Sequence, residues 1–185
     1  MNIFFDTEFT GLHPTTTLIS LGCVTENDCT FYAEFNDYDE SRLNDWLKMH
    51  VIQQLEFADV DEDFPTLNPH HARMKGSRSQ IASALDKWLS QFAPVQLWAD
   101  YPAYDWVLLC DLLGGALNLP DYIAGNALDV ATLFAVAGLD IDTDRAQFAE
   151  QPQRSLHHAL NDAILAKACY QKLMPQISTA RSQSN

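Results

Sequence analysis

Three apolar segments near the start of the chain predict β-strands, over residues 2–5, 17–25 and 29–35. The first is a short apolar run that ends in Asp-Thr-Glu, which is typical of a buried strand with acids at its end. The other two are rich in β-branched and aromatic residues, and the polar sequence Glu-Asn-Asp between them favours a hairpin turn. We therefore expect the chain to open with a three-stranded meander.

Apolar residues at helical spacing predict five helices, and a fourth strand is predicted over residues 95–99. The clearest helix begins after a serine and has an apolar face formed by Ile81, Leu85, Trp88 and Leu89. The predicted helices cover about residues 39–55, 77–92, 104–113, 129–137 and 155–173.

This order of elements predicts a mixed α/β protein with a single domain over residues 1–175. Residues 176–185 form a polar tail that we expect to be disordered. Residues 56–76 are polar and rich in Pro, Asp and His, and they are expected to form a long loop. Trp46 lies at an apolar position of the first helix, where packing in the core is the expected role.

The chain is strongly acidic, with a net charge of −14 from 11 Lys+Arg and 25 Asp+Glu. This balance argues against tight binding of extended duplexes, because affinity for long nucleic acids depends on basic groups that neutralise phosphates. A nucleic-acid enzyme remains compatible with it, since bound divalent cations would cancel site carboxylates. The basic residues near position 75 could form a flap that grips phosphates, or simply an exposed charged loop.

The sequence carries no long apolar span and no basic leader. Its four cysteines form no C-x-x-C pair, so neither a zinc site nor a redox motif is indicated. We therefore expect a protein of the reducing cytoplasm.

Two acids stand at the end of the first predicted strand. Side chains two residues apart project from the same face of a strand, so Asp6 and Glu8 are neighbours. Adjacent carboxylates repel each other, and a shared proton or a shared metal relieves the repulsion. Hard oxygen ligands of this kind suit Mg²⁺ or Mn²⁺. The alternative is an acidic strand end that faces solvent.

Two further acids lie within apolar helices. Asp105 stands at the start of one, where burial would be costly unless the acid is paired or bound to a metal. It could instead complement the helix dipole. Asp100, five residues earlier, competes with Asp105 as the acid of the site. Asp162 lies near the start of the last helix, shortly after His157 and His158.

Three short segments, FFDTEFTGL, AYDWVLL and HHALNDAILAKACY, occur in this order along the chain. They resemble the three motifs of the DEDDh exonuclease superfamily, and in particular its small stand-alone bacterial and phage 3′–5′ exoribonucleases. The resemblance implies a ribonuclease H-like α/β fold with a mixed five-stranded sheet flanked by helices. It also implies a 3′–5′ exonuclease that releases nucleoside monophosphates. Single-stranded or short RNA is favoured as the substrate, because the surface is acidic.

The resemblance also implies roles for individual residues. The four acids would hold two divalent metal ions, Mg²⁺ or Mn²⁺, with a histidine as general base for the attacking water. A homodimer is an expectation from the resemblance alone. The implied metal ligands are Asp6, Glu8, Asp105 and Asp162, and the implied contacts to the terminal nucleotide are Phe9, Thr10, Gly11 and Leu12.

The identity of the base is ambiguous. The superfamily pattern places the histidine five residues before the acid, which selects His157. Helix geometry favours His158, because residues four apart share a face whereas residues five apart diverge by about 140°. His157 can therefore serve only if it precedes the regular helix, for instance with Ser155 as N-cap. We expect His157 to be the base.

Other functions stay open. DNA could be the substrate, since the contacts that recognise a 2′-OH are encoded by no short motif. A non-catalytic module that binds nucleic acid is a further alternative. The sequence FFDTEFTG also resembles the nucleophile segment of aspartyl-phosphate phosphatases, but these require Asp at position 8. Many members of the superfamily carry Asn just before the second acid, where this chain has Asp100.

Overall fold

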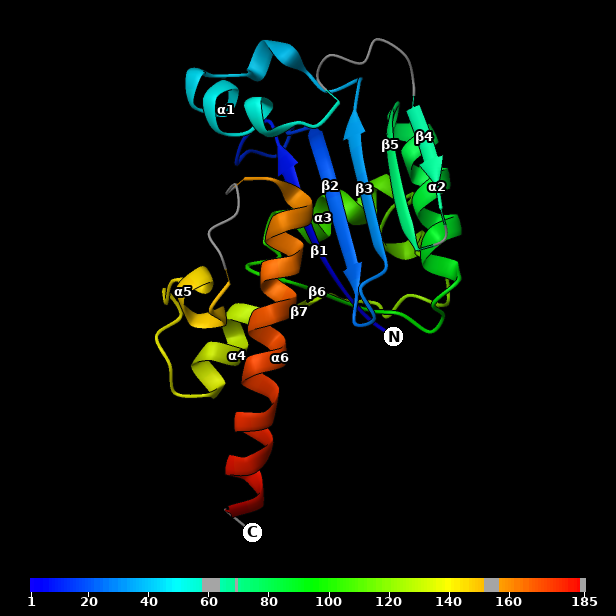
Figure 1. Ribbon diagram of the computed structural model, residues 1–185. Helices are drawn as coiled ribbons and strands as arrows, with labels where there is room; N and C mark the ends of the chain where they lie inside the picture. The colour runs from blue at the N-terminus through cyan, green and yellow to red at the C-terminus, as the bar shows by residue number, and fades with distance from the viewer. Residues whose placement is uncertain (58–63, 69, 152–156, 184–185) are drawn as a thin grey trace.

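A mixed seven-stranded sheet runs through the molecule in the order β4-β5-β3-β2-β1-β6-β7 (Figure 1). The computed structural model describes residues 1–57, 64–68, 70–151 and 157–183. β1, β2 and β3 form the predicted antiparallel meander, and β6 and β7 continue the sheet in parallel from β1. The strands are β1 (Asn2–Phe9), β2 (Leu18–Thr25), β3 (Thr30–Phe35), β4 (Phe64–Leu67), β5 (His71–Gly76), β6 (Gln96–Ala99) and β7 (Leu128–Asp129).

Helices cover both faces of the sheet (Figure 1). α2 and α3 pack on one face and α4 and α6 on the other, so that two apolar cores lie on either side of the strands. Alternation along β1 sends Ile3 and Phe5 into the first core and Phe4 into the second. None of the described helices is long and apolar enough to cross a membrane. The helices are α1 (Asp45–His50), α2 (Arg78–Ser90), α3 (Ala103–Leu112), α4 (Val130–Val136), α5 (Arg145–Ala149) and α6 (Ala159–Gln183), with 3-10 turns η1 (Glu40–Arg42), η2 (Ile52–Gln54) and η3 (Ala116–Asn118).

The first turn of α6 lies directly on the sheet at Gly22. Gly22 pairs in register with Asp6 on β1. A Cβ atom at Gly22 would overlap the backbone of Ala159 and Leu160. Glycine in the interior of a strand often marks such a close backbone approach. This contact brings the start of α6, with its acid and its preceding histidine, close to β1.

The helix predicted after Ser77 is confirmed. Ser77 and Gln80 form a capping box at the start of α2, which satisfies backbone N–H groups of the first turn. The four apolar residues predicted to face inward are all buried. Here the local sequence pattern was sufficient, because capping and periodicity both lie within one segment.

The predicted loop over residues 56–76 is wrong where the structure describes it. β5 pairs in parallel with β3, and β4 pairs with β5, so the sheet has seven strands rather than five. Along β5 the buried Ala72 and Met74 alternate with more exposed, charged neighbours. This period of two was hidden by the high polarity of the segment. Residues 58–63 and 69 lie outside the described residues.

Two helix predictions need correction. The helix expected over residues 39–55 is divided into η1, α1 and η2, because Asn44 caps a new helix by accepting the N–H of Leu47 at 2.8 Å. α6 continues to Gln183, beyond the predicted end near residue 173 and into the predicted disordered tail. Ile177 explains part of the extension, since it is buried in the core against α4. Residues 184 and 185 are outside the described part.

Candidate active site

Three acids from two elements converge beside the carboxyl end of β1. Asp6 and Glu8 project from β1 on the face that packs against α6, and Asp162 faces them from the first turns of α6. One oxygen from each carboxylate lies within 4.8 Å of the other two, a spacing that could hold a metal ion. The arrangement follows from the strand alternation and from the close packing of α6 at Gly22.

Asp105 approaches the same part of β1 from α3. It is buried, and its Oδ1 accepts hydrogen bonds from the N–H of Thr7 at 3.0 Å and from Thr7 Oγ1 at 2.6 Å. β6 pairs with β1 only as far as Phe4, which leaves the N–H of Thr7 available to this carboxylate. Asp105 thus stands next to the three-acid group without being part of it.

The electrostatics of this group are unfavourable in the protein alone. Burial, followed by the charge of Asp105, raises the pKa of Asp6 well above its usual value. Burial and the charge of Asp162 raise the pKa of Glu8 to about 8. Burial raises the pKa of Asp162 to about 6, although the backbone N–H groups of the two preceding histidines stabilise its charged form. Across the described ranges no Lys or Arg forms an ion pair with these three acids.

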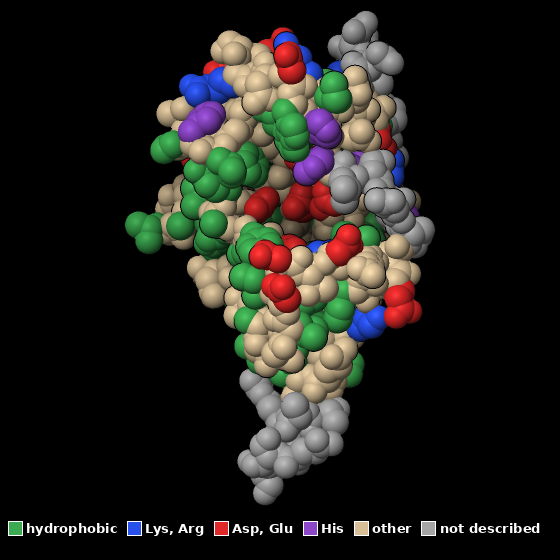
Figure 2. Space-filling model, turned by 90° about the vertical axis from the view of Figure 1, so that its left-hand side faces the viewer, with side chains coloured by type: hydrophobic (Ala, Val, Ile, Leu, Met, Phe, Trp, Pro, Cys, Tyr) green, Lys and Arg blue, Asp and Glu red, His purple; other side chains and the backbone are tan. Residues whose placement is uncertain are grey.

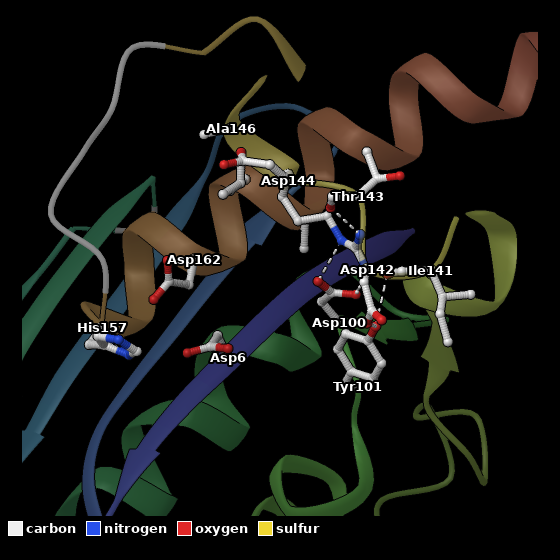
Figure 3. Close-up of a pocket in the computed structure, with 13 residues that line it drawn as sticks. Asp6, Asp100, Tyr101, Ile141, Asp142, Thr143, Asp144, Ala146, His157 and Asp162 are labelled. Carbon is white, nitrogen blue, oxygen red and sulfur yellow. Dashed lines mark hydrogen bonds and ion pairs between the residues drawn. The ribbon is translucent and has the colours of Figure 1, made fainter. Parts of the chain in front are cut away.

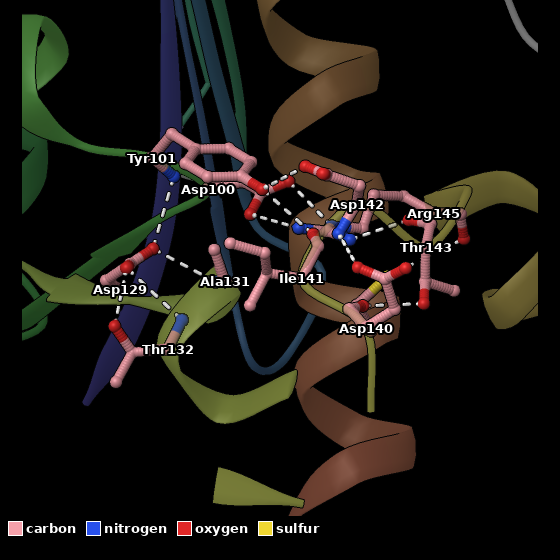
Figure 4. Close-up of polar contacts among 11 residues, drawn as sticks. Asp100, Tyr101, Asp129, Ala131, Thr132, Asp140, Ile141, Asp142, Thr143 and Arg145 are labelled. Carbon is pink, nitrogen blue, oxygen red and sulfur yellow. Dashed lines mark hydrogen bonds and ion pairs between the residues drawn. The ribbon is translucent and has the colours of Figure 1, made fainter. Parts of the chain in front are cut away.

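Asp100, the competing acid, is neutralised by the protein itself. Arg145 of α5 donates to both of its carboxylate oxygens, at 2.8 and 3.2 Å (Figure 4). Tyr101, which has a positive φ of 54°, follows it and donates its hydroxyl to the carbonyl of Ile141 at 2.8 Å. The carboxylate of Asp100 is therefore paired with a guanidinium, whereas Asp6 has no such partner among the residues that the structure describes.

The acids open into a pocket of about 480 Å³. In the space-filling view, acidic side chains line a hollow between the upper and lower parts of this face, and histidines gather at its upper rim (Figure 2). Asp6, Asp162 and His157 lie at one end of the pocket, and Asp100 and Tyr101 lie at the other (Figure 3). The pocket gives a ligand access to the acid group.

The two adjacent histidines lie in different environments. His157 precedes α6 with a φ of 61° and lines the pocket beside Asp162. Burial and the neighbouring His50 lower its pKa, which favours the neutral ring. His158 is 7% exposed and stacks on Tyr32 with ring centroids 4.6 Å apart. Regular helix begins only at Ala159, which meets the condition for His157; Ser155 lies outside the described residues.

The end of β1 and the loop after it carry the residues predicted to contact the terminal nucleotide, and they follow Glu8 directly in the chain. Phe9 stacks on Tyr104 with ring centroids 5.5 Å apart, and Leu12 is 76% exposed. Gly11 has a φ of 146°, which favours glycine. The hydroxyl of Thr10 is buried and accepts the N–H of Thr17 at 2.9 Å, so this side chain is used within the loop. Substrate contacts by these residues stay predictions.

The basic residues near position 75 do not form a flap. They lie in β5 and at the start of α2, and their charges are used within the protein. Arg73 pairs with Glu56, Arg78 pairs with Asp111, and the Lys75 ammonium donates to a backbone carbonyl. They are therefore poor candidates for gripping phosphates.

Two contributors to the site were missed from the sequence. Gly22 could have been recognised as a glycine inside a strand. Trp46 was expected in the core, but it is 49% exposed and contacts His157 edge to face, with ring centroids 4.9 Å apart. No sequence signal predicts this contact, because the two residues are far apart in the chain.

Comparison with known proteins identifies the relatives of this chain. The 3′-5′ exoribonuclease Rv2179c-like domain matches residues 1–174. Two proteins of Mycobacterium tuberculosis, the 3′-5′ exoribonucleases Rv2179c (strain H37Rv) and MT2234.1 (strain CDC 1551), are each similar to it. Each is 31% identical over 165 residues, which is 88% of this chain and 87% of the relative.

Solved structures agree with this relationship. The RNase domain of the yeast Pop2 protein has a TM-score of 0.60 at 13% identity, covering 93% of this chain and 77% of that one. The Neurospora crassa Pan2 catalytic unit, a protease and nuclease domain, has a TM-score of 0.52 at 12% identity, covering 99% of this chain and 28% of that one. These likenesses confirm the predicted ribonuclease H-like α/β fold. The match of the family model to residues 1–174 and the 31% identity to the two Mycobacterium proteins show that the chain belongs to the Rv2179c-like family of 3′-5′ exoribonucleases.

Proposed function

We propose that this protein is a metal-dependent exoribonuclease that removes nucleoside monophosphates from the 3′ ends of single-stranded or short RNA. The observation that carries the proposal is the group formed by Asp6, Glu8 and Asp162, which is half-buried and lacks a compensating cation in the described chain. Leaving such charges unpaired is costly, and a bound cation removes the cost. The named activity of the Mycobacterium relatives supports the choice of RNA.

The donor set fits a hard divalent cation. All its ligand atoms are carboxylate oxygens, which suit Mg²⁺ or Mn²⁺ better than softer metals. Asp6, Glu8 and Asp162 would hold one ion, and Asp6 with Asp105 would hold a second, directly or through water. Divalent cations in such sites lower the pKa of bound water and stabilise the leaving oxygen of an in-line displacement.

His157 is the proposed general base. It lies in the pocket next to Asp162, and its lowered pKa keeps a ring nitrogen free to accept a proton from the attacking water. Its backbone N–H stabilises the charged form of Asp162, so the base and a metal ligand are electrostatically linked. His158 is proposed to be structural, because its ring is enclosed by Tyr32 and Glu56.

The remaining parts of the proposal concern substrate and setting. Phe9, Gly11 and Leu12 follow Glu8 directly in the chain and would contact the terminal nucleotide, as would the backbone of Thr10. The four cysteines are free and buried, which supports a cytoplasmic setting. A homodimer stays a prediction from the family resemblance.

A labelled-oligonucleotide assay tests the function. Matched RNA and DNA with free or blocked 3′ ends would be incubated with Mg²⁺, with Mn²⁺ or with a chelator. We expect stepwise shortening of RNA with a free 3′ end, which stops with the chelator, with the 3′ block and with Asp6→Ala. Shortening of DNA in preference to RNA would overturn the substrate assignment. Metal binding without shortening of either polymer would instead indicate a non-catalytic binding module.

A further inference from the structure

One row of residues crosses the sheet from the acid group to β5. Residues that pair in register on neighbouring strands project from the same face of a sheet. Since Asp6 projects toward α6, the whole row faces this helix (Figure 1). The row consists of Asp6 on β1, Gly22 on β2, Tyr32 on β3 and Arg73 on β5.

The ring of His158 is enclosed above this row. It stacks on Tyr32 with ring centroids 4.6 Å apart and an interplanar angle of 14°. Burial lowers the pKa of His158, which favours the neutral ring. Its Nδ1 lies 3.4 Å from the backbone nitrogen of Asn161, whose N–H can only donate, so Nδ1 is the acceptor. The proton is therefore on Nε2, which donates to Glu56 Oε1 at 3.2 Å.

Glu56 is itself held from two directions. Its Oε2 pairs with Arg73, which leaves Oε1 for His158. Its backbone N–H donates to the buried carboxylate of Glu34 at 2.6 Å, and the N–H of the following residue donates to the same carboxylate at 3.1 Å. Glu56 therefore presents its carboxylate to His158 from a fixed backbone.

His158 connects this support to the proposed active site. It stands between His157 and the first residue of α6, and the backbone N–H groups of both histidines stabilise the charged form of Asp162. His157 has a φ of 61°, a conformation that residues other than glycine seldom adopt. Such a conformation persists only where the surrounding structure fixes it. The contacts of the His158 ring supply a fixed point directly next to it.

We propose that Glu56 is a positioning residue, which fixes the turn before α6 through His158 and so sets the places of His157 and Asp162 relative to β1. The inference rests on the proposed function, in which His157 is the base and Asp162 is a metal ligand. The close contact at Gly22 holds the next residues of α6. The start of the helix is therefore fixed from two neighbouring strands.

Steady-state kinetics with single-stranded RNA and calorimetric titration with Mn²⁺ test the proposal. We expect Glu56→Ala to lower kcat by about 10–100-fold, the range seen when an outer partner of a metal site is lost, with a parallel loss of Mn²⁺ affinity. Glu56→Gln should restore most of both, because its amide oxygen still accepts from His158 Nε2. A raised KM with unchanged kcat and unchanged Mn²⁺ affinity would overturn the proposal and indicate that the carboxylate contacts RNA.

Asp86→Ala is the matched control. Asp86 of α2 accepts a hydrogen bond from the ring hydroxyl of Tyr122 at 2.5 Å, on the face of the sheet opposite to α6. Its replacement also removes a carboxylate bonded to a ring, and should lower the melting temperature without changing kcat or Mn²⁺ affinity. A loss of kcat equal to that of Glu56→Ala would show that the effect is one of general stability, and would overturn the proposal.

A double substitution tests whether Glu56 acts through His158. His158→Phe keeps a ring against Tyr32 and removes both ring nitrogens. In this background, Glu56→Ala should cause no further loss of kcat, because the bond between the two residues is already absent. A further loss equal to that in wild type would show that Glu56 acts by another route, and would overturn the proposal.

An NMR measurement on the metal-free protein separates this inference from the proposed function. The Nε2 proton of His158, assigned with His158→Phe, should exchange slowly with water in wild type, Glu56→Gln and Asp86→Ala, and rapidly in Glu56→Ala. Rapid exchange in a Glu56→Ala enzyme with unchanged kcat would overturn the positioning role while the function stands. The expected exchange pattern in a wild-type protein that degrades no RNA would overturn the function, and the Mn²⁺ titration would then decide the positioning role alone.

Discussion

Glu8 and Glu34 occupy one row of the sheet, but their carboxylates differ in the hydrogen-bond donors that surround them. Each pairs in register with Ser20 of β2, from β1 on one side and from β3 on the other. Glu34 accepts hydrogen bonds from the Tyr32 hydroxyl at 2.8 Å and from the N–H of Glu56 at 2.6 Å. Burial and the charges of Asp162 and Asp105 instead raise the pKa of Glu8 to about 8.

The difference shows that the protein compensates the charge of its structural acids with hydrogen-bond donors or a cation. Donors are brought to Glu34 from two segments, and Arg145 is brought to Asp100. At Asp6 and Glu8 the described chain supplies no cation, although the same sheet could have offered one. Uncompensated burial of this kind is expected where a ligand completes the site.

The largest effect should come from exchanging the two glutamates for glutamine. Glu8→Gln should reduce RNA hydrolysis to the limit of detection, because it removes a metal-ligand charge, while the metal-free protein becomes more stable at pH 8. Glu34→Gln should retain turnover and lose stability, because its N–H donors would lose a charged acceptor. Activity assays and thermal unfolding of both variants would measure this. A similar loss of turnover in both would remove the distinction between the two acids.

The adjacent histidines should show the next largest difference. His157→Ala should lower kcat by about 10²–10⁴-fold, as expected for loss of a general base, with little change in thermal stability. His158→Ala should lower the free energy of unfolding by about 1–3 kcal/mol, since it removes a stacked ring and a partner of Glu56. It should lower kcat less than His157→Ala does. Denaturant unfolding and single-turnover kinetics on the two variants would test this. The reverse pattern would assign the base to His158.

Gly22→Ala should disturb the group of Asp6, Glu8 and Asp162, because Gly22 contacts the start of α6. The added methyl group would push the start of α6 away from β1 and move Asp162 from Asp6. A displacement of about 1 Å can cost about 10²-fold in rate, and metal affinity should fall in parallel. Gly125→Ala is the control, because a Cβ there meets no atom within 4 Å. Metal titration by calorimetry and activity assays would compare the two, and an unchanged Gly22→Ala enzyme would show that α6 is not held by this contact.

The smallest predicted effect is a pH dependence of stability without metal. Glu8 has a pKa of about 8 in the folded protein against an ordinary value of 4.5, so the folded state binds more protons across this interval. Stability in a chelator should therefore fall as pH rises from about 4.5 to about 8. A loss of about 1 kcal/mol would lower Tm by about 2–4 °C in a domain of this size. Mg²⁺ or Mn²⁺ should reverse the fall at pH 8, and Glu8→Gln should flatten it.

Much of this protein was determined by its sequence alone. The opening meander, α2 with its cap and the strand-end acids all arise from local patterns, because strand alternation, helix periodicity and capping act within a few residues. The order of the three acid-bearing segments was enough to predict the fold class and the exonuclease family. The chemical types of side chain at the site therefore follow from the sequence.

Tertiary structure decided which of these side chains meet. His157 rather than His158 faces the acids because α6 begins at Ala159 and is held against Gly22. Trp46 lies beside the pocket instead of in the core because α1 is short and turns its other face inward. β5 is a strand because β3 offers it a partner. Each outcome depends on contacts between segments distant in the chain, and such contacts leave no local pattern in the sequence.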